Sequence, residues 1–352
     1  MASARHLAER GGPLIWGEFL FCASVIFAAG SQLARYGDML AEKTGMGRTW
    51  IGLILLATVT SLPELATGVS AVTLAGLPDI AAGDVLGSCV FNLMLIGMLD
   101  LFYRPEPILS RVDQGQILAA GFGILLLGIV ALGMLAEARR LAGGGLLWLG
   151  VYTPVIAVLY GIAVRQVFQF EQKRMAALIK AEAEALHYRD VPAPVIYRRT
   201  AAAALLVIGA GVWLAFLGGR VADETGWGQT FVGNLLIAAS TSLPEVVTVF
   251  VALKLAAPDL AIANLFGSNL FNIAILAIDD AAYLRGPLLA DVSLAHLFSA
   301  VTALMMTGIC ITGLIYRAQR KAWVFVGWDT VALFGLYLLN AYLLFTFGRG
   351  ET

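Results

Sequence analysis

Charged residues, cysteine and histidine are scarce in this chain. Only 13% of its 352 residues are charged, and the 23 Lys and Arg residues balance the 24 Asp and Glu residues to a net charge of −1. Without a basic excess, the sequence predicts no nucleic-acid partner. The three cysteines stand singly without CxxC spacing, so they predict neither a disulfide framework nor a thiolate metal site.

Apolar residues dominate instead. Hydrophobic residues make up 59% of the chain, and a mean hydropathy of +0.83 is too high for a soluble domain of this length. A membrane-spanning helix needs about 20 predominantly apolar residues. The predicted spans are 15–36, 48–74, 78–102, 114–136, 144–165, 200–221, 228–253, 259–283, 293–316 and 322–347. We therefore predict an all-α integral membrane protein with ten transmembrane helices, embedded in a lipid bilayer.

One long polar segment, residues 167–198, separates an N-terminal half, 1–166, from a C-terminal half, 199–352. Short cytoplasmic loops carry an excess of Lys and Arg. Most of the basic residues fall on the side of this linker. We therefore predict a cytoplasmic linker and outside termini, in a plasma membrane of the bacterial inner-membrane type.

The two halves contain related sequences. GMGRTWIGLILLATVTSLPE, residues 45–64, aligns without a gap to GWGQTFVGNLLIAASTSLPE, residues 226–245. PDIAAGDVLGSCVFN, residues 78–92, aligns to PDLAIANLFGSNLFN, residues 258–272. Each half holds five predicted spans, an odd number, so the second copy is inverted relative to the first. Inverted repeats are typical of secondary transporters, whose substrate sites lie near the membrane midplane.

Each repeat places a glutamate directly after a proline inside an apolar run. Burying the charge of Glu64 or Glu245 in a bilayer costs at least about 2.5–3.5 kcal/mol, so both positions call for a cation or a proton. Pro63 and Pro244 have no amide hydrogen to donate to the preceding turn. This predicts broken helices with free backbone carbonyls, which transporters use to coordinate hard cations.

Polar side chains recur at helical spacing beside the two acids. The spacing of three or four residues puts each pair on one helix face; the residues are Ser61, Ser88 and Asn92 in the first copy and Ser242, Ser268 and Asn272 in the second. An all-oxygen set with two carboxylates suits Ca²⁺, with Na⁺ able to use overlapping ligands. We predict that Gly87 and Gly267, like the two prolines, interrupt their helices, and that they allow neighbouring helices to come close.

TSLPE followed by GSxxFN, present in both halves, resembles the alpha repeats of the sodium/calcium exchanger family of cation/calcium antiporters. The specific part of the resemblance covers about 45–103 and 226–285. It implies exchange of Na⁺ for Ca²⁺ without a cofactor, in which the first and sixth helices slide across a rigid core. We expect a monomer to be sufficient for transport, and the sequence leaves the oligomeric state open. It also implies a Ca²⁺ site made by Glu64, Glu245 and the carbonyls of Thr60 and Thr241. The implied flanking Na⁺ sites use Ser61, Ser88, Asn92, Ser242, Ser268 and Asn272.

Some positions depart from the family pattern. Val59 and Ser240 replace the glycine that usually precedes TSLPE, and Asp84 replaces the asparagine of a usual Gly-Asn pair. Asp84 is a candidate outer-mouth acid that attracts cations, the alternative being a solvated carboxylate near a helix start. Asn272 stands where potassium-dependent relatives carry aspartate, which predicts transport without K⁺.

Proton coupling is the alternative mechanism, in which the two glutamates titrate in place of binding Na⁺. The chain lacks the G-N-x-x-E motif that is typical of the cation/proton branch. It also lacks the HExxH, GxSxG and GxGD motifs of enzymes, so we predict no enzymatic activity.

Four further ionisable residues lie near predicted span ends; they are Asp100, Asp279, Asp280 and His296. We expect the three aspartates to form interfacial ion pairs with arginines four to six residues further along the chain. We expect the histidine to pack or to lie at the interface, the alternative being a pH sensor.

Overall fold

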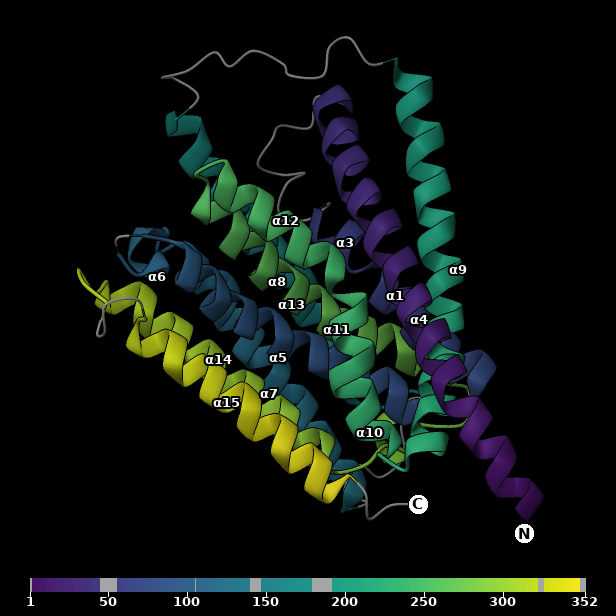
Figure 1. Ribbon diagram of the computed structural model, residues 1–352. Coiled ribbons are helices and arrows are strands. Elements are labelled where there is room, and N and C mark those ends of the chain that lie inside the picture. The colour runs from purple at the N-terminus through teal and green to yellow at the C-terminus, as the bar shows by residue number, and fades with distance from the viewer. Residues whose placement is uncertain are drawn as a thin grey trace.

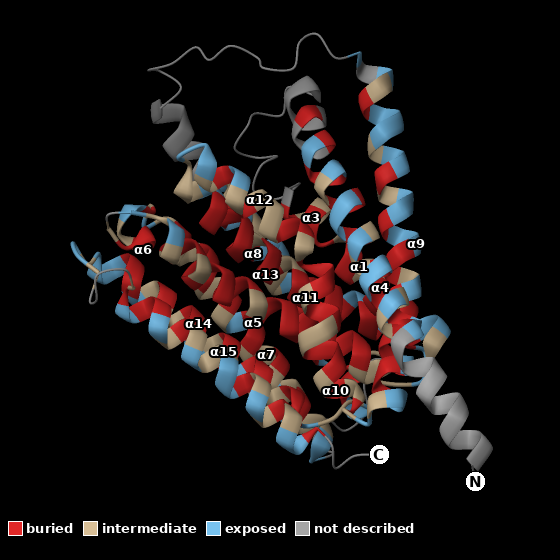
Figure 2. Ribbon diagram, viewed as in Figure 1, coloured by how far each residue is buried: buried red, intermediate tan, exposed pale blue. Residues whose placement is uncertain are grey.

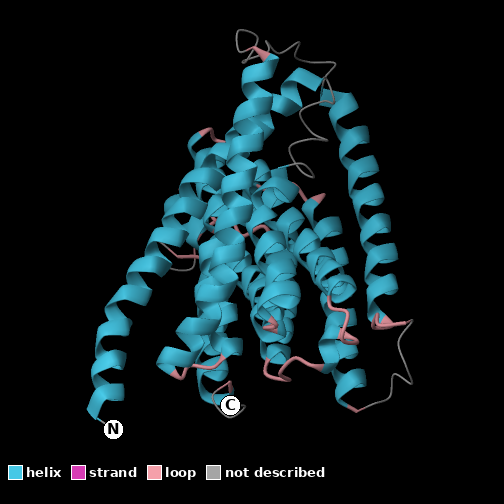
Figure 3. Cartoon of the chain, turned by 90° about the vertical axis from the view of Figure 1, so that its right-hand side faces the viewer, coloured by secondary structure: helices cyan, strands magenta, loops and turns pink. Residues whose placement is uncertain are grey.

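Helices make up nearly all of the computed structural model, which describes residues 2–44, 56–104, 106–139, 147–178, 192–321 and 326–348. No β-sheet occurs in these ranges (Figure 3). Helices satisfy every backbone polar group within one segment, which an apolar environment requires. The centre of the predicted linker and the beginnings of three predicted spans, at 48, 144 and 322, lie outside the described residues.

Eight helices of the described residues are long and apolar enough to cross a membrane. They are α1 (Ala2–Thr44), α5 (Pro78–Phe102), α7 (Gln116–Ala138), α8 (Tyr152–Leu178), α9 (Ala193–Thr225), α13 (Pro258–Ala282), α14 (His296–Tyr316) and α15 (Trp328–Phe347). Each of them overlaps one predicted span. The short elements α6 (Ile108–Arg111) and η4 (Leu288–Ala290) follow α5 and α13.

The two remaining predicted spans, which carry TSLPE, are interrupted. The described part of the first consists of α3 (Leu56–Thr60), α4 (Leu62–Ser70) and the π-helical η2 (Ala71–Ala75). The second consists of α10 (Gln229–Phe231), the π-helical η3 (Val232–Ile237), α11 (Ala238–Thr241) and α12 (Leu243–Lys254). The α11–α12 break bends the chain by 45°. Both breaks fall at the serine of TSLPE, because the proline two residues later has no amide hydrogen to continue the helix.

Gly87 and Gly267 do not interrupt their helices, so the expectation of helix breaks at these two positions is wrong. Both α5 and α13 run continuously through the GSxxFN segment. A single glycine in a well-packed helix costs about 1 kcal/mol, which packing readily offsets. Within the described residues, the two breaks in the TSLPE spans are therefore explained by proline and not by these glycines.

The centre of the bundle is formed by α5, α13 and the interrupted helices, where buried residues concentrate (Figure 2). Within the most apolar 18-residue stretch of each span, 78% of the residues are buried in α5 and 83% in α13. The other six long spans bury 22–50% of theirs. On one flank, α1 and α9 pack side by side and run in opposite directions (Figure 1). The peripheral helices expose large apolar side chains such as Leu132 and Leu205, a surface that lipid tails solvate well.

The two ends of the bundle carry different parts of the chain. At one end, here called the terminal end, α1 begins and α15 ends (Figure 1). At the opposite end, here called the linker end, α8 ends at Leu178 and α9 begins at Ala193. The described parts of the polar segment 167–198 thus extend these two helices, and Pro194 fits the first turn of α9, where no amide hydrogen is needed.

Candidate cation site at the helix breaks

The two glutamates, called the central pair below, lie in the first turns of α4 and α12 and are fully buried. The break before each helix positions a serine hydroxyl against the acid of the other half. Ser242 Oγ donates to Glu64 Oε1 at 3.0 Å, and Ser61 Oγ donates to Glu245 Oε1 at 3.2 Å. The two TSLPE motifs, far apart in sequence, therefore form one site.

A second serine reaches each acid from a continuous helix. Ser88 of α5 lies 3.4 Å from Glu64 Oε1, and Ser268 of α13 lies 3.3 Å from Glu245 Oε1. Ser242 Oγ also lies 3.0 Å from Ser88 Oγ. Each carboxylate is thus contacted by one serine from each half of the chain.

The second oxygen of each acid has no partner. Glu64 Oε2 and Glu245 Oε2 are buried and accept no hydrogen bond within the described residues. Buried polar groups are normally hydrogen-bonded, and an exception marks a place for an ion or a proton. The described residues contain no cluster of three or more His, Cys, Asp or Glu side chains suited to a metal. A cation here would depend on two carboxylates and neutral oxygens, as hard cations prefer.

The three asparagines of the GSxxFN segments lie where α5 and α13 cross. Asn92 Nδ2 donates to Asn269 Oδ1 at 3.1 Å, which leaves Asn92 Oδ1 without a partner. Both polar atoms of the buried Asn272 side chain also lack a hydrogen-bond partner in the described residues. Asn269, which the repeat pattern alone does not single out, also donates to the Cys89 carbonyl at 3.2 Å. Its place directly after Ser268 was the signal for it.

The two threonines of the TSLPE motifs differ in their contacts. Thr241 Oγ1 donates to Asp84 Oδ1 at 2.7 Å, whereas Thr60 Oγ1 lies 3.5 Å from Ser268 Oγ. Asp84 is fully buried. The alternative of a solvated carboxylate at a helix start is therefore wrong, and Asp84 belongs to the surroundings of the central pair.

Glycines bring neighbouring helices into close contact with the interrupted spans. A Cβ on Gly87 would lie 2.2 Å from the backbone oxygen of Asn234 in η3. A Cβ on Gly30 of α1 would lie 2.3 Å from Pro244 Cγ, and one on Gly211 of α9 would lie 3.2 Å from the Pro63 oxygen. The long helices α1 and α9 thus each pack against the proline break of the other half.

The aspartates near the helix ends do not share one kind of environment. Asp100 forms an ion pair with Lys321 at 3.3 Å, both side chains being buried. Asp280 is surrounded by four neutral donors: the Tyr152 hydroxyl and Thr153 Oγ1, both at 2.5 Å, and the amides of Gly150 and Leu288.

Asp279 and His296 complete the set of ionisable residues near the span ends. The expected interfacial ion pair is wrong for Asp280, whose hydrogen-bond donors are neutral. It is also wrong for Asp279, whose two oxygens are buried without any partner in the described residues. His296 is fully buried, with Nε2 2.9 Å from Asp79 Oδ1 and Nδ1 3.0 Å from Asn234 Nδ2.

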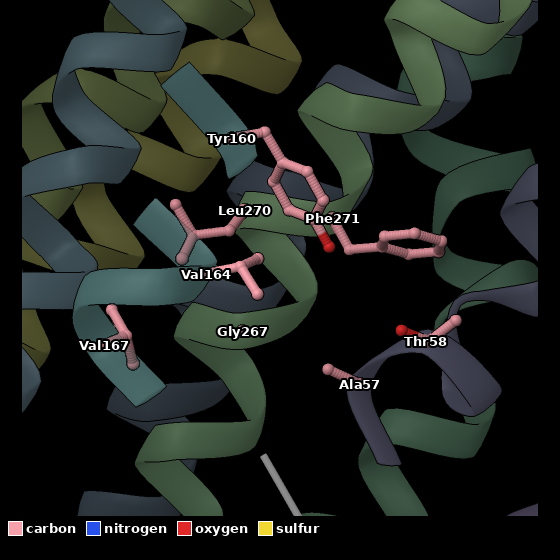
Figure 4. A pocket seen from close by; sticks show the side chains of 8 residues that line it. All are labelled: Ala57, Thr58, Tyr160, Val164, Val167, Gly267, Leu270 and Phe271. Atoms are coloured by element: carbon pink, nitrogen blue, oxygen red, sulfur yellow. The ribbon is translucent and has the colours of Figure 1, made fainter. Parts of the chain in front are cut away.

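A small cavity of about 20 Å³ lies between α3, α8 and α13. Figure 4 shows its lining, which is mostly apolar; the residues are Ala57, Thr58, Tyr160, Val164, Val167, Gly267, Leu270 and Phe271. Two of its lining residues are close in sequence to proposed ligands: Gly267 precedes Ser268, and Thr58 stands two residues before Thr60. Since the central pair and its four serines are fully buried, the structure shows an enclosed site.

The sequence pattern that defines the family described as "Sodium/calcium exchanger protein" matches residues 14–166 and 200–346 of this chain. This chain belongs to the sodium/calcium exchanger family. Members of this family are secondary transporters and not enzymes. The chain is accordingly a multi-pass membrane protein of the cation/calcium antiporter type.

Curated proteins and a solved structure are similar to this chain over most of its length. The chain is 26% identical to inner membrane protein YrbG of Escherichia coli over 80% of its own length and 85% of that protein. It is 26% identical to sodium/calcium exchanger MaX1 of Methanosarcina acetivorans, covering 93% and 97% of the two chains. A structure of the sodium-calcium exchanger NCX_Mj matches 93% of this chain and 97% of that chain with a TM-score of 0.59 and 20% identity.

Proposed function

We propose that this protein exchanges Na⁺ for Ca²⁺ across a membrane, with Glu64 and Glu245 as ligands shared by both cations. The observation that carries the proposal is the central pair itself, in which each buried acid keeps one unpartnered oxygen. Two carboxylates neutralise one Ca²⁺ or hold Na⁺ ions, but they do not serve both full sets at once. Competition for these oxygens makes transport an exchange and prevents an uncoupled leak.

Neutral oxygens complete the proposed ion sites. The backbone carbonyls of Thr60 and Thr241, at the helix breaks, are proposed as further Ca²⁺ ligands. The unpartnered amide oxygens of Asn92 and Asn272 support a role as ligands. The proposed flanking Na⁺ sites use Ser61, Ser88, Asn92, Ser242, Ser268 and Asn272. Asn272 carries no charge, in line with transport that does not need K⁺.

Ten spans in two inverted five-helix repeats are the proposed topology, with the two halves at 1–166 and 199–352. The opposite directions of α1 and α9, the first spans of the two halves, support the inversion. The reciprocal serine–glutamate bonds support it as well. We place the terminal end outside the cell and the linker end in the cytoplasm of a bacterial type of inner membrane, because of the basic residues around the linker.

Alternating access is proposed to occur by sliding of α1 and α9 across the core. Both helices lie on one flank of the bundle (Figure 1). Gly30 and Gly211 present no side chain where these helices meet Pro244 and Pro63. At both crossings the sliding helix contributes only a glycine, which leaves no side chain of its own to interlock with the break, so the two glycines support this motion.

The test is Ca²⁺ uptake into proteoliposomes of the purified protein. Vesicles loaded with Na⁺ are compared with vesicles loaded with K⁺ or choline, and a third set carries only a pH gradient. We expect uptake that requires internal Na⁺ and needs no K⁺. Uptake driven by the pH gradient alone would instead establish proton coupling, and an absence of uptake in all three sets would refute calcium exchange.

A further inference from the structure

Two further buried carboxylates lie on α5 and α13, the continuous helices that contribute serines to the central pair. Asp84 of α5 and Asp279 of α13 are both fully buried. Asp84 Oδ2 and both oxygens of Asp279 have no hydrogen-bond partner in the described residues. Buried acids of this kind are rare in membrane proteins and mark ion or proton pathways. A Ca²⁺ ion bound by the central pair would still leave these oxygens without a partner.

Both aspartates lie on the side of the central pair that faces the terminal end. Asp84 is one turn before Ser88, towards the beginning of α5. Asp279 lies against Gly68, which is one turn beyond Glu64 on α4; a Cβ at Gly68 would be 2.5 Å and 2.8 Å from the two carboxylate oxygens.

Contacts connect both aspartates to the helix breaks that hold the central pair. Thr241, whose hydroxyl donates to Asp84, stands directly before Ser242, which donates to Glu64. Asp279 lies against Gly68, one turn beyond Glu64 on the same helix. Such a sequence of negative groups provides successive favourable positions for a cation that enters from the terminal end.

The equivalent positions of the other half are neutral. The repeat alignment pairs Asp84 with Asn264 and Asp279 with Leu99. Asn264 is buried as well, and neither of its side-chain polar atoms has a partner in the described residues. The extra negative charge is thus confined to the side of the terminal end, while the central pair is common to both halves.

We propose that Asp84 and Asp279 form a second cation site, which loads the transported cation from the terminal end. The identity of that cation as Ca²⁺ or Na⁺ rests on the proposed function. The unpartnered carboxylate oxygens are its ligands, together with the Thr241 hydroxyl that already contacts Asp84. The site gives the transporter a higher cation affinity at the terminal end than at the linker end.

The first test measures half-saturating Ca²⁺ concentrations separately at the two ends, with right-side-out and everted membrane vesicles. Asp84→Asn and Asp279→Asn are each expected to weaken apparent Ca²⁺ affinity at the terminal end by about ten-fold, without a change at the linker end. Asp223→Asn, which removes an exposed charge near the same end of α9, is the control and is expected to leave both values unchanged. Equal shifts at both ends, or none, would overturn the proposal.

A second pair of variants separates charge from folding. Gly68→Ala keeps all four acids but places a methyl group against Asp279, and it is expected to weaken affinity at the terminal end alone. The double variant Asp84→Asn with Asn264→Asp moves the acid to the equivalent position of the other half. It is expected to raise affinity at the linker end and lower it at the terminal end.

Binding without transport distinguishes this inference from the proposed function. In the Glu64→Gln protein in detergent, CaCl₂ or NaCl at constant ionic strength with choline chloride is expected to raise the melting temperature. Adding Asp279→Asn should abolish that shift. If neither salt stabilises the Glu64→Gln protein but acidification does, Asp84 and Asp279 bind protons, and the proposed cation site is refuted. If the wild-type protein showed no Na⁺-driven Ca²⁺ flux, only the proposed function would be refuted.

Discussion

Around Glu64 and around Glu245 the hydrogen bonds correspond pair by pair. Each acid accepts from a serine of the opposite TSLPE motif, at 3.0 and 3.2 Å, and lies 3.4 or 3.3 Å from the serine of its own GSxxFN segment. The surroundings of this centre do not correspond: one side has two buried aspartates where the other has asparagine and leucine. The carboxylate contacts are thus alike in both halves, and the difference in buried acids between the two sides of the membrane lies outside them.

The helix ends show the same mixture of symmetry and difference. Asp79 accepts a hydrogen bond from the Ser293 amide at 2.7 Å, as Asp259 does from the Asp113 amide at 2.6 Å. At the terminal end, however, His296 also contacts Asp79, and the repeat places glutamine at the position equivalent to this histidine. The hydrogen bonds of Asp79 and Asp259 are thus common to both ends of the bundle, whereas His296 provides an ionisable partner at the terminal end.

The largest expected effect comes from breaking the symmetric centre. Glu64→Gln and Glu245→Gln should each reduce Na⁺-dependent Ca²⁺ uptake by about 100-fold or more, because a buried charge that compensates the cation is lost. The two losses should be similar, since both acids have matched contacts. The measurement is uptake into Na⁺-loaded proteoliposomes, with the exposed Glu224→Gln as a control. Normal exchange in either variant would refute the site assignment.

Next in size is the effect of the aspartates that anchor the ends of α5 and α13. Asp100→Asn and Asp280→Asn should each lower stability by about 2–4 kcal/mol, because charged acceptors of several buried hydrogen bonds are worth more than neutral ones. Both positions anchor a following turn, through the amides of Ile108 and Leu288. Thermal unfolding in detergent measures the loss, and Asp223→Asn should leave the melting temperature unchanged. A large loss at only one position would show that the two anchors are not equivalent.

A smaller effect is expected where the long helices cross the breaks. Gly30→Ala and Gly211→Ala should cost about 1–3 kcal/mol by overpacking, and they should slow exchange while leaving Ca²⁺ affinity unchanged. Gly209→Ala is the matched control on α9, because a Cβ there meets nothing within 4 Å. Stopped-flow flux and equilibrium Ca²⁺ binding separate rate from affinity. A weaker Ca²⁺ affinity with an unchanged rate would contradict a role in helix sliding.

Much of this arrangement could be predicted from the sequence, because its signals are local. Apolar length predicted the spans, and proline explained the two breaks. The duplicated motifs predicted which segments belong together. Contacts that depend on packing could not be predicted: the burial of Asp84 and Asp279, and the close approach of Gly30 to Pro244, follow from where helices cross. The glycines of α5 and α13 looked like breaks only because helix packing, which keeps them helical, leaves no local signal.

The smallest expected effect comes from the serines that link the two halves. Ser61→Ala and Ser242→Ala each remove one hydroxyl that contacts a carboxylate, an interaction worth about 1.5–3 kcal/mol when the acid is charged. The acids themselves remain, so exchange should continue with Na⁺ and Ca²⁺ affinities weakened by about ten-fold. Ser24→Ala, on the exposed side of α1, is the control, since its hydroxyl bonds only to its own helix. The two serines have matched geometry, so both variants should weaken the same affinities. If one variant changed the Na⁺ affinity alone and the other changed the Ca²⁺ affinity alone, the two serines would serve different ions.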